Sequence, residues 1–214
     1  SGNLILGTSR SGALLYGLTL SEHYKACICA DDREQLKAFY KNALHRITQH
    51  SGRRIVFIDD DSRAFKNTVE ECPSCRYISG ATELDAFIEE LKPELNARLE
   101  EPAAPHEQLL IVIAEFNDFF KTLTDEQAAF MRKVFRYIDS PQYKICFLCG
   151  FDVNGEKNND GLFMSLIVNA ESYVLCADCY KIATAKIETL PLIPEAKSRS
   201  CFFGLERNTV EIRW

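Results

Sequence analysis

The sequence predicts an α/β fold, a mostly parallel sheet with helices on both faces and a C-terminal antiparallel hairpin at one edge. Two observations support this prediction. Short apolar runs alternate with segments of helical periodicity, and the run at 109–114 (LLIVIA) is continuously apolar, as in a central parallel strand covered on both faces. The chain has 214 residues, 46% of them hydrophobic, which suits one large domain. We therefore expect residues 1–214 to form a single domain.

The first hundred residues predict strands and helices in alternation. Helices are recognised by apolar residues at three- and four-residue spacing, and strands by short apolar runs between polar turns. Thr82 and Asp85 resemble a capping box at the start of the last helix, and Pro93 is expected to kink or split that helix. In chain order, we expect a strand at 3–6, a helix at 13–20, a strand at 24–30, a helix at 36–47, strands at 54–59 and 76–79, and a helix at 84–99.

The alternation continues after a polar, proline-marked loop at 101–106. Thr124 with Gln127 predicts a capped helix that runs to about residue 138. Together these segments imply right-handed crossovers and a doubly wound sheet. The remaining strands are expected at 109–114, 143–150, 173–177, 201–205 and 210–213, the last two forming the edge hairpin.

Composition excludes some functional classes. A formal net charge of -6 argues against a nonspecific nucleic-acid binder, because neutralising phosphates requires a basic face. No run of 18 or more apolar residues occurs, so the sequence predicts neither a membrane span nor a signal peptide. Strand character begins directly after Ser1 and Gly2, which we interpret as a cloning remnant in front of a domain excised from a larger protein.

Nine cysteines, three pairs of which have C-x-x-C spacing, raise the question of zinc. Cys146 and Cys149 fall in a predicted strand, where such a pair points to opposite faces and cannot chelate one ion. Cys72 and Cys75 fall in a predicted turn and could bind zinc only with two further ligands. Buried reduced thiols are the favoured interpretation, and we predict no metal site, with a zinc-stabilised binding module as an alternative.

A glycine loop follows the first predicted strand and has the outline of a phosphate-binding loop. In the pattern G-x-x-x-x-G-K-[ST], backbone N–H groups wrap the phosphates, the lysine reaches the outer phosphates and the hydroxyl binds Mg²⁺. Here the lysine and the hydroxyl residue are missing, although Arg10 could supply one positive charge. The candidate nucleotide-binding residues are Gly7, Thr8, Ser9, Arg10, Ser11, Gly12, Ala13 and Leu14.

The apolar run at 109–114 has the form of the second half of an ATP site. In such sites the strand ends in an acidic residue that holds Mg²⁺ and a glutamate that orients the attacking water. Ala114 stands where the metal-binding Asp is expected, while Glu115 keeps the position of the catalytic glutamate. With Ala13 and Leu14, three charge-bearing or metal-binding side chains are lost, which predicts lost hydrolysis. ATP binding is left open, and Mg²⁺ would be held poorly.

Two other groups have competing interpretations. Asp59–Asp61 could hold a cation, but a solvated turn at the end of a strand is favoured. Phe116, Phe119 and Phe120 could form a face that binds a partner, but core packing of at least two of them is favoured.

The chain resembles the RecA-like P-loop ATPase domains of the FtsK/SpoIIIE family over nearly its whole length. The resemblance rests on the strand and glycine loop at Gly7, the LLIVIAEF strand, the later ICFLCGF strand and the FFGLERNTVEIRW ending. Within that family it is most similar to the C-terminal, third ATPase domain of the type VII secretion ATPases of Gram-positive bacteria, through the strand at Arg76–Ser79, the helix ending at Glu100 and the segment from Ser198.

This resemblance implies a degenerate ATPase domain of a protein secretion motor. Its role would be to engage secreted substrates or to regulate the neighbouring ATPase domains of the parent chain, which could assemble as a homo-oligomer. It implies a cytoplasmic domain of a protein anchored in the cell membrane, with no nucleic-acid partner. The alternative within the family is an active, ATP-hydrolysing translocase domain.

Overall fold

The computed structural model describes most of the chain between residues 24 and 152 and the strands on either side of that part. In the strands at 3–8, 15–19, 172–176, 200–205 and 208–213, what is described is the course and pairing of the backbone. The described residues are 3–8, 15–19, 22, 24–30, 32–47, 53–72, 74–152, 172–176, 200–205 and 208–213.

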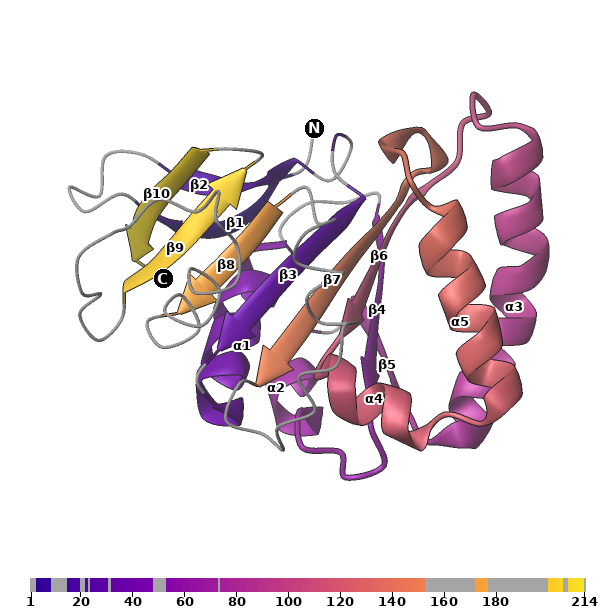
Figure 1. The fold of residues 1–214 in the computed structure, drawn as a ribbon, viewed down its shortest axis with the longest axis horizontal. Helices are drawn as coiled ribbons and strands as arrows, with labels where there is room; N and C mark the ends of the chain where they lie inside the picture. Colours follow the sequence, from indigo (N-terminus) through magenta and orange to yellow (C-terminus); the bar gives the residue numbers. More distant parts are fainter. Residues whose placement is uncertain are drawn as a thin grey trace.

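Five neighbouring strands form an all-parallel sheet, in the order β3-β7-β6-β4-β5 (Figure 1). Nearly every residue of β3, β6 and β7 is buried, which explains why these strands are apolar throughout rather than alternating. The central strands were therefore predictable from apolar runs alone. The five strands are β3 (Lys25–Ala30), β4 (Arg53–Asp59), β5 (Cys75–Ser79), β6 (Gln108–Ile113) and β7 (Ile145–Asp152).

Helices cover both faces of this sheet, as predicted. On one face lie α1 (Arg33–Ile47) and α2 (Lys66–Glu70), and on the other lie α3 (Ala81–Glu100), α4 (Phe116–Thr122) and α5 (Asp125–Tyr137) (Figure 1). The strands alternate between two cores. In β6, for example, Leu110 and Val112 pack with α1, whereas Ile111 and Ile113 pack with α3 and α4.

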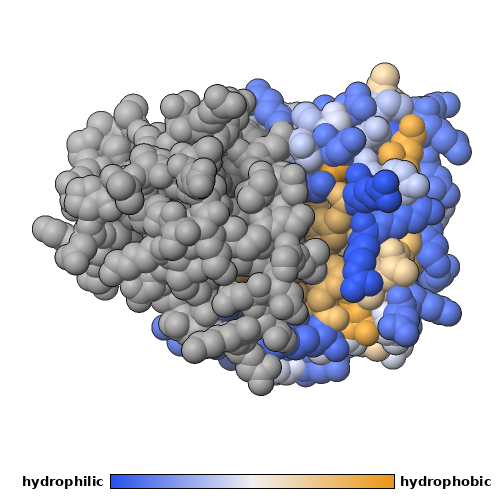
Figure 2. Space-filling view, viewed as in Figure 1, coloured by the Kyte–Doolittle hydropathy of each residue, from blue (hydrophilic) through white to orange (hydrophobic). Residues whose placement is uncertain are grey.

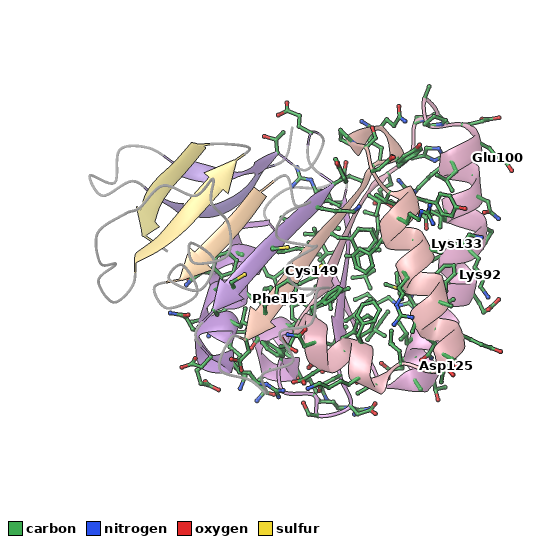
Figure 3. All side chains as sticks on the ribbon, viewed as in Figure 1. Lys92, Glu100, Asp125, Lys133, Cys149 and Phe151 are labelled. Carbon is green, nitrogen blue, oxygen red and sulfur yellow. The ribbon has the colours of Figure 1, made fainter. Side chains whose placement is uncertain are left out.

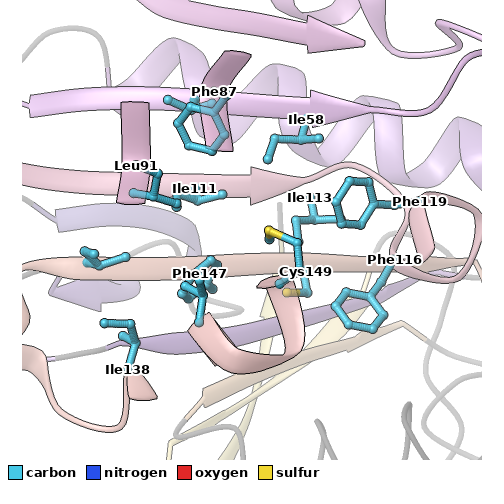
Figure 4. Packing of buried hydrophobic residues seen from close by; sticks show 14 of the residues in the cluster. Ile58, Phe87, Leu91, Ile111, Ile113, Phe116, Phe119, Ile138, Phe147 and Cys149 are labelled. Carbon is cyan, nitrogen blue, oxygen red and sulfur yellow. The ribbon is translucent and has the colours of Figure 1, made fainter. Parts of the chain in front are cut away.

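The core under α3, α4 and α5 is rich in aromatic side chains. Figure 4 shows Phe116 and Phe119 of α4 beside Ile113 and Cys149, and Phe87 of α3 above the strands. Charged side chains of α3 and α5, such as Lys92 and Lys133, point away from the sheet (Figure 3). The predicted core packing of Phe116 and Phe119 is confirmed, because both are buried.

The remaining described strands extend the sheet beyond β3. β8 (Ser172–Cys176) runs parallel to β3, and β9 (Ser200–Leu205) pairs antiparallel with both β8 and β10 (Asn208–Arg213). β10 borders β1 (Asn3–Thr8), which pairs antiparallel with β2 (Leu15–Thr19). The last two strands, β9 and β10, thus pair antiparallel, but they do not form the edge of the sheet as predicted. The edge strand on this side is β2.

Three local predictions need correction. The helix expected at 13–20 is wrong, because Leu15–Thr19 form strand β2 and pair with β1. α3 is not split at Pro93; this proline is exposed, so water can satisfy the carbonyl that loses its N–H partner. α3 also begins at Ala81 without a capping box, and Asp85 instead accepts a hydrogen bond of 2.6 Å from Gln127 Nε2.

The capping box of α5 is confirmed. Gln127 N–H donates to Thr124 Oγ1 at 3.2 Å, and Thr124 N–H donates to Gln127 Oε1 at 2.9 Å. α4, a short helix that the sequence reading missed, precedes it directly. Among the helices that the structure describes, none has the length and apolar character needed to cross a membrane.

Arg98 joins the end of α3 to the start of the central strands. Its guanidinium is 3% exposed and donates to the carbonyl oxygens of Glu107 (2.7 Å), Tyr143 (2.8 Å) and Lys144 (3.2 Å). It also pairs with Glu94 at 2.6 Å. A buried cation is tolerated only when it is paired and hydrogen-bonded in this way.

We predict that Arg98→Met lowers the free energy of unfolding by about 2–4 kcal/mol, because three carbonyl oxygens lose a charged donor and only that of Lys144 is known to keep another, the Leu109 N–H. Urea denaturation followed by circular dichroism measures this. Arg76→Met is the matched control: Arg76 pairs with Glu90 at the surface, so we expect a loss of less than about 1 kcal/mol. Equal losses in the two variants would contradict the role of Arg98.

Candidate functional site

The carboxyl ends of the parallel strands meet at one edge of the sheet, and helices of both faces begin there. β3 leads into α1 on one face, and β6 leads into α4 on the other face. In open α/β sheets, ligands bind at the carboxyl edge where connections leave to opposite faces. The two junctions, β3–α1 and β6–α4, therefore define the candidate site.

The glycine loop does not connect a strand to a helix, which is what the sequence predicted. Gly7 and Thr8 belong to β1 and pair with Tyr16 and Leu15 of β2, so residues 9–14, which lie outside the described residues, connect two antiparallel strands. A phosphate loop joins a strand to a helix, whose N-terminus attracts the anion. The predicted strand–loop–helix arrangement is thus wrong. Phosphate binding by Gly7–Leu14 stays a prediction, now without the support of a helix N-terminus.

The strand-to-helix turn in the parallel sheet is the β3–α1 junction instead. Asp32 precedes α1, and its Oδ1 accepts a hydrogen bond of 2.8 Å from Gln35 N–H. A carboxylate of the chain thus caps the helix N-terminus, where a bound phosphate would otherwise accept from the same amides. Sequence reasoning missed this junction because it contains no glycine. The signal that could have found it is the apolar KACICA strand followed at once by a helical segment.

Glu115 lies at the β6–α4 junction and is the N-cap of α4. Its carboxylate accepts hydrogen bonds from Asp118 N–H at 2.6 Å and from Asp152 N–H, at the end of β7, at 3.2 Å. The side chain is buried, with 5% of the residue exposed. Burial raises the pKa of Glu115 to about 7, against the opposing effect of the two amide hydrogen bonds; the charges of Asp118 and Asp152 raise it further.

Ala114 and the carbonyl groups beside it are covered by Tyr40 from α1. The Tyr40 hydroxyl donates to the carbonyl oxygens of Ala114 at 3.0 Å and Ile113 at 3.2 Å. Gly150 of β7 makes room for this contact, since a Cβ atom there would collide with the Tyr40 hydroxyl and the Ala114 carbonyl oxygen. The position expected to bind metal is therefore packed against a phenol ring and buried.

A shallow cavity of about 490 Å³ lies along the rim of this edge. Arg33 of α1 forms an ion pair with Asp118 of α4, which links the two junctions, and Lys121 pairs with the same carboxylate at 3.2 Å. The lining contains three carboxylates and two cations, so it does not favour a polyphosphate. The cavity is lined by Arg33, Asp60, Asp61, Ser62, Asp118, Lys121 and Thr122.

The three aspartates at the end of β4, Asp59–Asp61, do not act as one group. Asp59 is buried and organises the following loop, because its carboxylate accepts from Phe65 N–H at 2.9 Å and from the Tyr77 hydroxyl at 2.7 Å. Asp61 is exposed. Within the described part of the chain, no group of three or more His, Cys, Asp or Glu residues is placed to hold a metal ion.

The cysteine pairs also separate by structure. Cys146 packs in the core under α1 and Cys149 in the core under α4 and α5, which confirms that this pair points to opposite faces of β7. Cys72 and Cys75 are joined by the turn that leads into β5, whose first residue is Cys75. The third pair is Cys176 and Cys179, of which Cys179 lies outside the described residues.

No protein-family model and no curated protein matches the sequence. The fold, however, matches several solved structures. The cytoplasmic domain of EssC superposes with a TM-score of 0.77 at 12% identity, covering 100% of this chain and 43% of that one. EccC from Thermomonospora curvata (ATPases 2 and 3), solved in complex with a signal sequence peptide, gives 0.68 at 11% identity, covering 100% of this chain and 40% of that one.

A third match is the pCW3 conjugation coupling protein TcpA, a monomer form with ATPγS. Its TM-score is 0.66 at 14% identity, covering 99% of this chain and 65% of that one. The chain thus spans less than two thirds of the length of each of these proteins. Its fold is similar to that of these three proteins, at identities that establish the fold alone.

We predict that Glu115 makes stability fall as pH rises. Its pKa in the folded protein is about 7 against an ordinary value of 4.5, so between these values the folded state binds more protons than the unfolded state. The stabilisation is complete below pH 4.5 and is lost as pH rises through 7. At about 1.4 kcal/mol for each pKa unit, the loss is on the order of 3 kcal/mol.

Urea denaturation at intervals from pH 4 to pH 8 measures this dependence. In Glu115→Gln the fall is expected to be largely absent, whereas Glu126→Gln, which removes a carboxylate from the exposed surface of α5, should retain it. A Glu115→Gln protein with the wild-type pH dependence would contradict the assignment.

Proposed function

We propose that this chain is a hydrolysis-deficient FtsK/SpoIIIE-like ATPase domain of a type VII secretion motor. It would engage secreted substrates or regulate neighbouring ATPase domains rather than consume ATP. The observation that carries this proposal is the position of the Glu115 carboxylate, which is buried and accepts hydrogen bonds from two backbone amides. The residue before it, Ala114, has no side chain that can bind a metal ion.

The chemistry of hydrolysis explains why this observation matters. Phosphoryl transfer is catalysed by positioned charge, namely a metal ion, cations on the phosphates and a carboxylate that orients water. Here Ala114 offers no metal ligand, and Arg33 faces Asp118. Asp32 accepts from the α1 amide that a phosphate would use. The groups that could bind phosphate or orient water are thus engaged in contacts within the protein.

The fold supports the assignment to secretion. The EssC and EccC structures share it, and the EccC structure contains a signal sequence peptide, which is consistent with a role in substrate engagement. By the same likeness we propose that the chain is a cytoplasmic part of a membrane-anchored protein, with secreted proteins and neighbouring ATPase domains as its partners. The assignment to the C-terminal, third domain belongs to this proposal.

An active ATPase domain is the second candidate. The retained Glu115 favours it, as does TcpA, which shares the fold and was solved with ATPγS. This candidate requires that the Glu115 carboxylate leave its two amide partners when nucleotide binds. It also requires a source of positive charge other than Arg33, which is already paired.

Calorimetric titration of ATP, with and without Mg²⁺, separates the two candidates. For the hydrolysis-deficient domain we expect no binding tighter than about 1 mM and no phosphate release. Because no metal holds the phosphates, Mg²⁺ should make no difference. Micromolar binding together with Mg²⁺-dependent turnover that Glu115→Gln abolishes would establish the active domain instead.

A second titration tests substrate engagement. Binding of a type VII signal sequence peptide in the absence of nucleotide is the expected result, with a scrambled peptide of equal composition as the control. Equal binding of both peptides, or binding that depends on ATP, would contradict the proposed role.

A further inference from the structure

Cys72 and Cys75 form a compact dithiol in the turn between α2 and β5. Cys72 N–H donates to Val69 O at 2.8 Å at the end of α2, and Cys75 N–H donates to Cys72 O at 3.0 Å. Such a turn brings the Cα atoms of its first and fourth residues to within about 7 Å, and disulfides form over Cα separations of about 4.4–6.8 Å. The turn therefore places the two thiols at bonding range without movement of α2 or β5.

The two cysteines also border one cavity. The Ser74 hydroxyl, which lies between them in the chain, is 4.0 Å from the Cys72 sulfur. Beside them lies a cavity of about 220 Å³, lined by Lys66, Val69, Glu70, Cys72, Cys75 and Tyr77. Cys72 is 3% exposed and Cys75 is half-buried, so this cavity is the approach to the dithiol for a small reagent.

We propose that Cys72 and Cys75 are a redox-active dithiol that low-molecular-weight disulfides oxidise to an intramolecular disulfide. Cys72 is the attacking residue and Cys75 the resolving residue. The Cys72 thiolate attacks one sulfur of the oxidant, forming a mixed disulfide and releasing one thiolate. Cys75 then gives up its proton, attacks the Cys72 sulfur and releases the second thiolate. The dithiol is oxidised by two electrons, and the oxidant is reduced to two thiols.

The order of the two steps follows from the hydrogen bonds. Donation from the Cys75 thiol lowers the pKa of Cys72 to about 7, and the turn amides lower it further against the effect of burial. The pKa of Cys75 is raised, chiefly because its proton is shared with the Cys72 sulfur. Since the thiolate is the nucleophile, Cys72 reacts first.

Other described cysteines serve as internal controls. Burial raises the pKa of Cys27 to about 12 and also raises that of Cys149. Both are buried, as Cys72 is, but neither lines the cavity beside the turn. They lie on strands, away from the α2 turn, and should be inert until the protein unfolds. Reactivity confined to residues 72 and 75 would therefore not be explained by general exposure of thiols.

The test is incubation of the folded chain with glutathione disulfide, followed by alkylation, proteolysis and mass spectrometry. We expect a Cys72–Cys75 disulfide, while Cys27 and Cys149 stay reduced. Cys75→Ser should stop at a mixed disulfide of Cys72 with glutathione, whose rate of formation rises with pH as the Cys72 thiolate forms. Cys72→Ser should leave Cys75 unmodified over the same time.

Three results would overturn the proposal. They are an unreacted Cys72 in both the wild type and Cys75→Ser, equal reactivity of the two single variants, or stoichiometric zinc in the purified protein that protects both thiols. Thermal unfolding of each variant, followed by circular dichroism, shows that the fold is retained. These readouts do not depend on nucleotide or peptide binding, so they are independent of the proposed function.

Discussion

The Glu115 carboxylate is the contact on which the carboxyl edge of the sheet depends. A buried carboxylate is tolerated only when hydrogen bonds replace its water, and here the N–H groups of Asp118 and Asp152 provide them. One of these bonds starts α4 and the other fixes the end of β7, so two elements on either side of β6 are positioned by one side chain. While it makes both contacts, the carboxylate is not free to orient an attacking water. The proposed loss of hydrolysis therefore rests on the group that most resembles a catalytic residue.

On the opposite face of the sheet, polar groups near the start of α1 are also hydrogen-bonded or paired within the protein. Asp32 caps α1, Tyr40 covers the Ala114 carbonyl, and Arg33 forms an ion pair with Asp118 across the edge. In a nucleotide site, these amides and cations would be left for the ligand, and the free energy of their unmet hydrogen bonds would contribute to binding. Here the protein satisfies them internally. The fold keeps the geometry of a ligand-binding edge, while its polar groups stabilise the folded chain instead.

Prediction from sequence succeeded where local signals and burial agree. β3, β4, β6 and β7 are apolar because both faces of the sheet are covered, and the Thr124–Gln127 capping box identifies the start of α5. It failed where strand pairing determines the secondary structure. Leu15–Thr19 have helix-compatible residues but form a strand that pairs with β1, so the helix expected after the glycine loop is absent. In the site, Glu115 was found from the apolar run before it. Asp32 was not found, because the search for a phosphate site relied on glycine spacing and the β3–α1 junction contains no glycine.

The C-x-x-C pairs show how backbone conformation, rather than spacing, decides the chemistry of a motif. On β7, an odd separation of three residues sends Cys146 into one core and Cys149 into the other, with the whole sheet between their side chains. In the turn that leads into β5, Cys75 N–H donates to Cys72 O across the same separation, and both residues line one cavity. Both pairs contain cysteines that are largely buried, so burial alone does not distinguish them. The difference is that a turn brings together the side chains that a strand separates, and only the turn offers two electrons to one reagent.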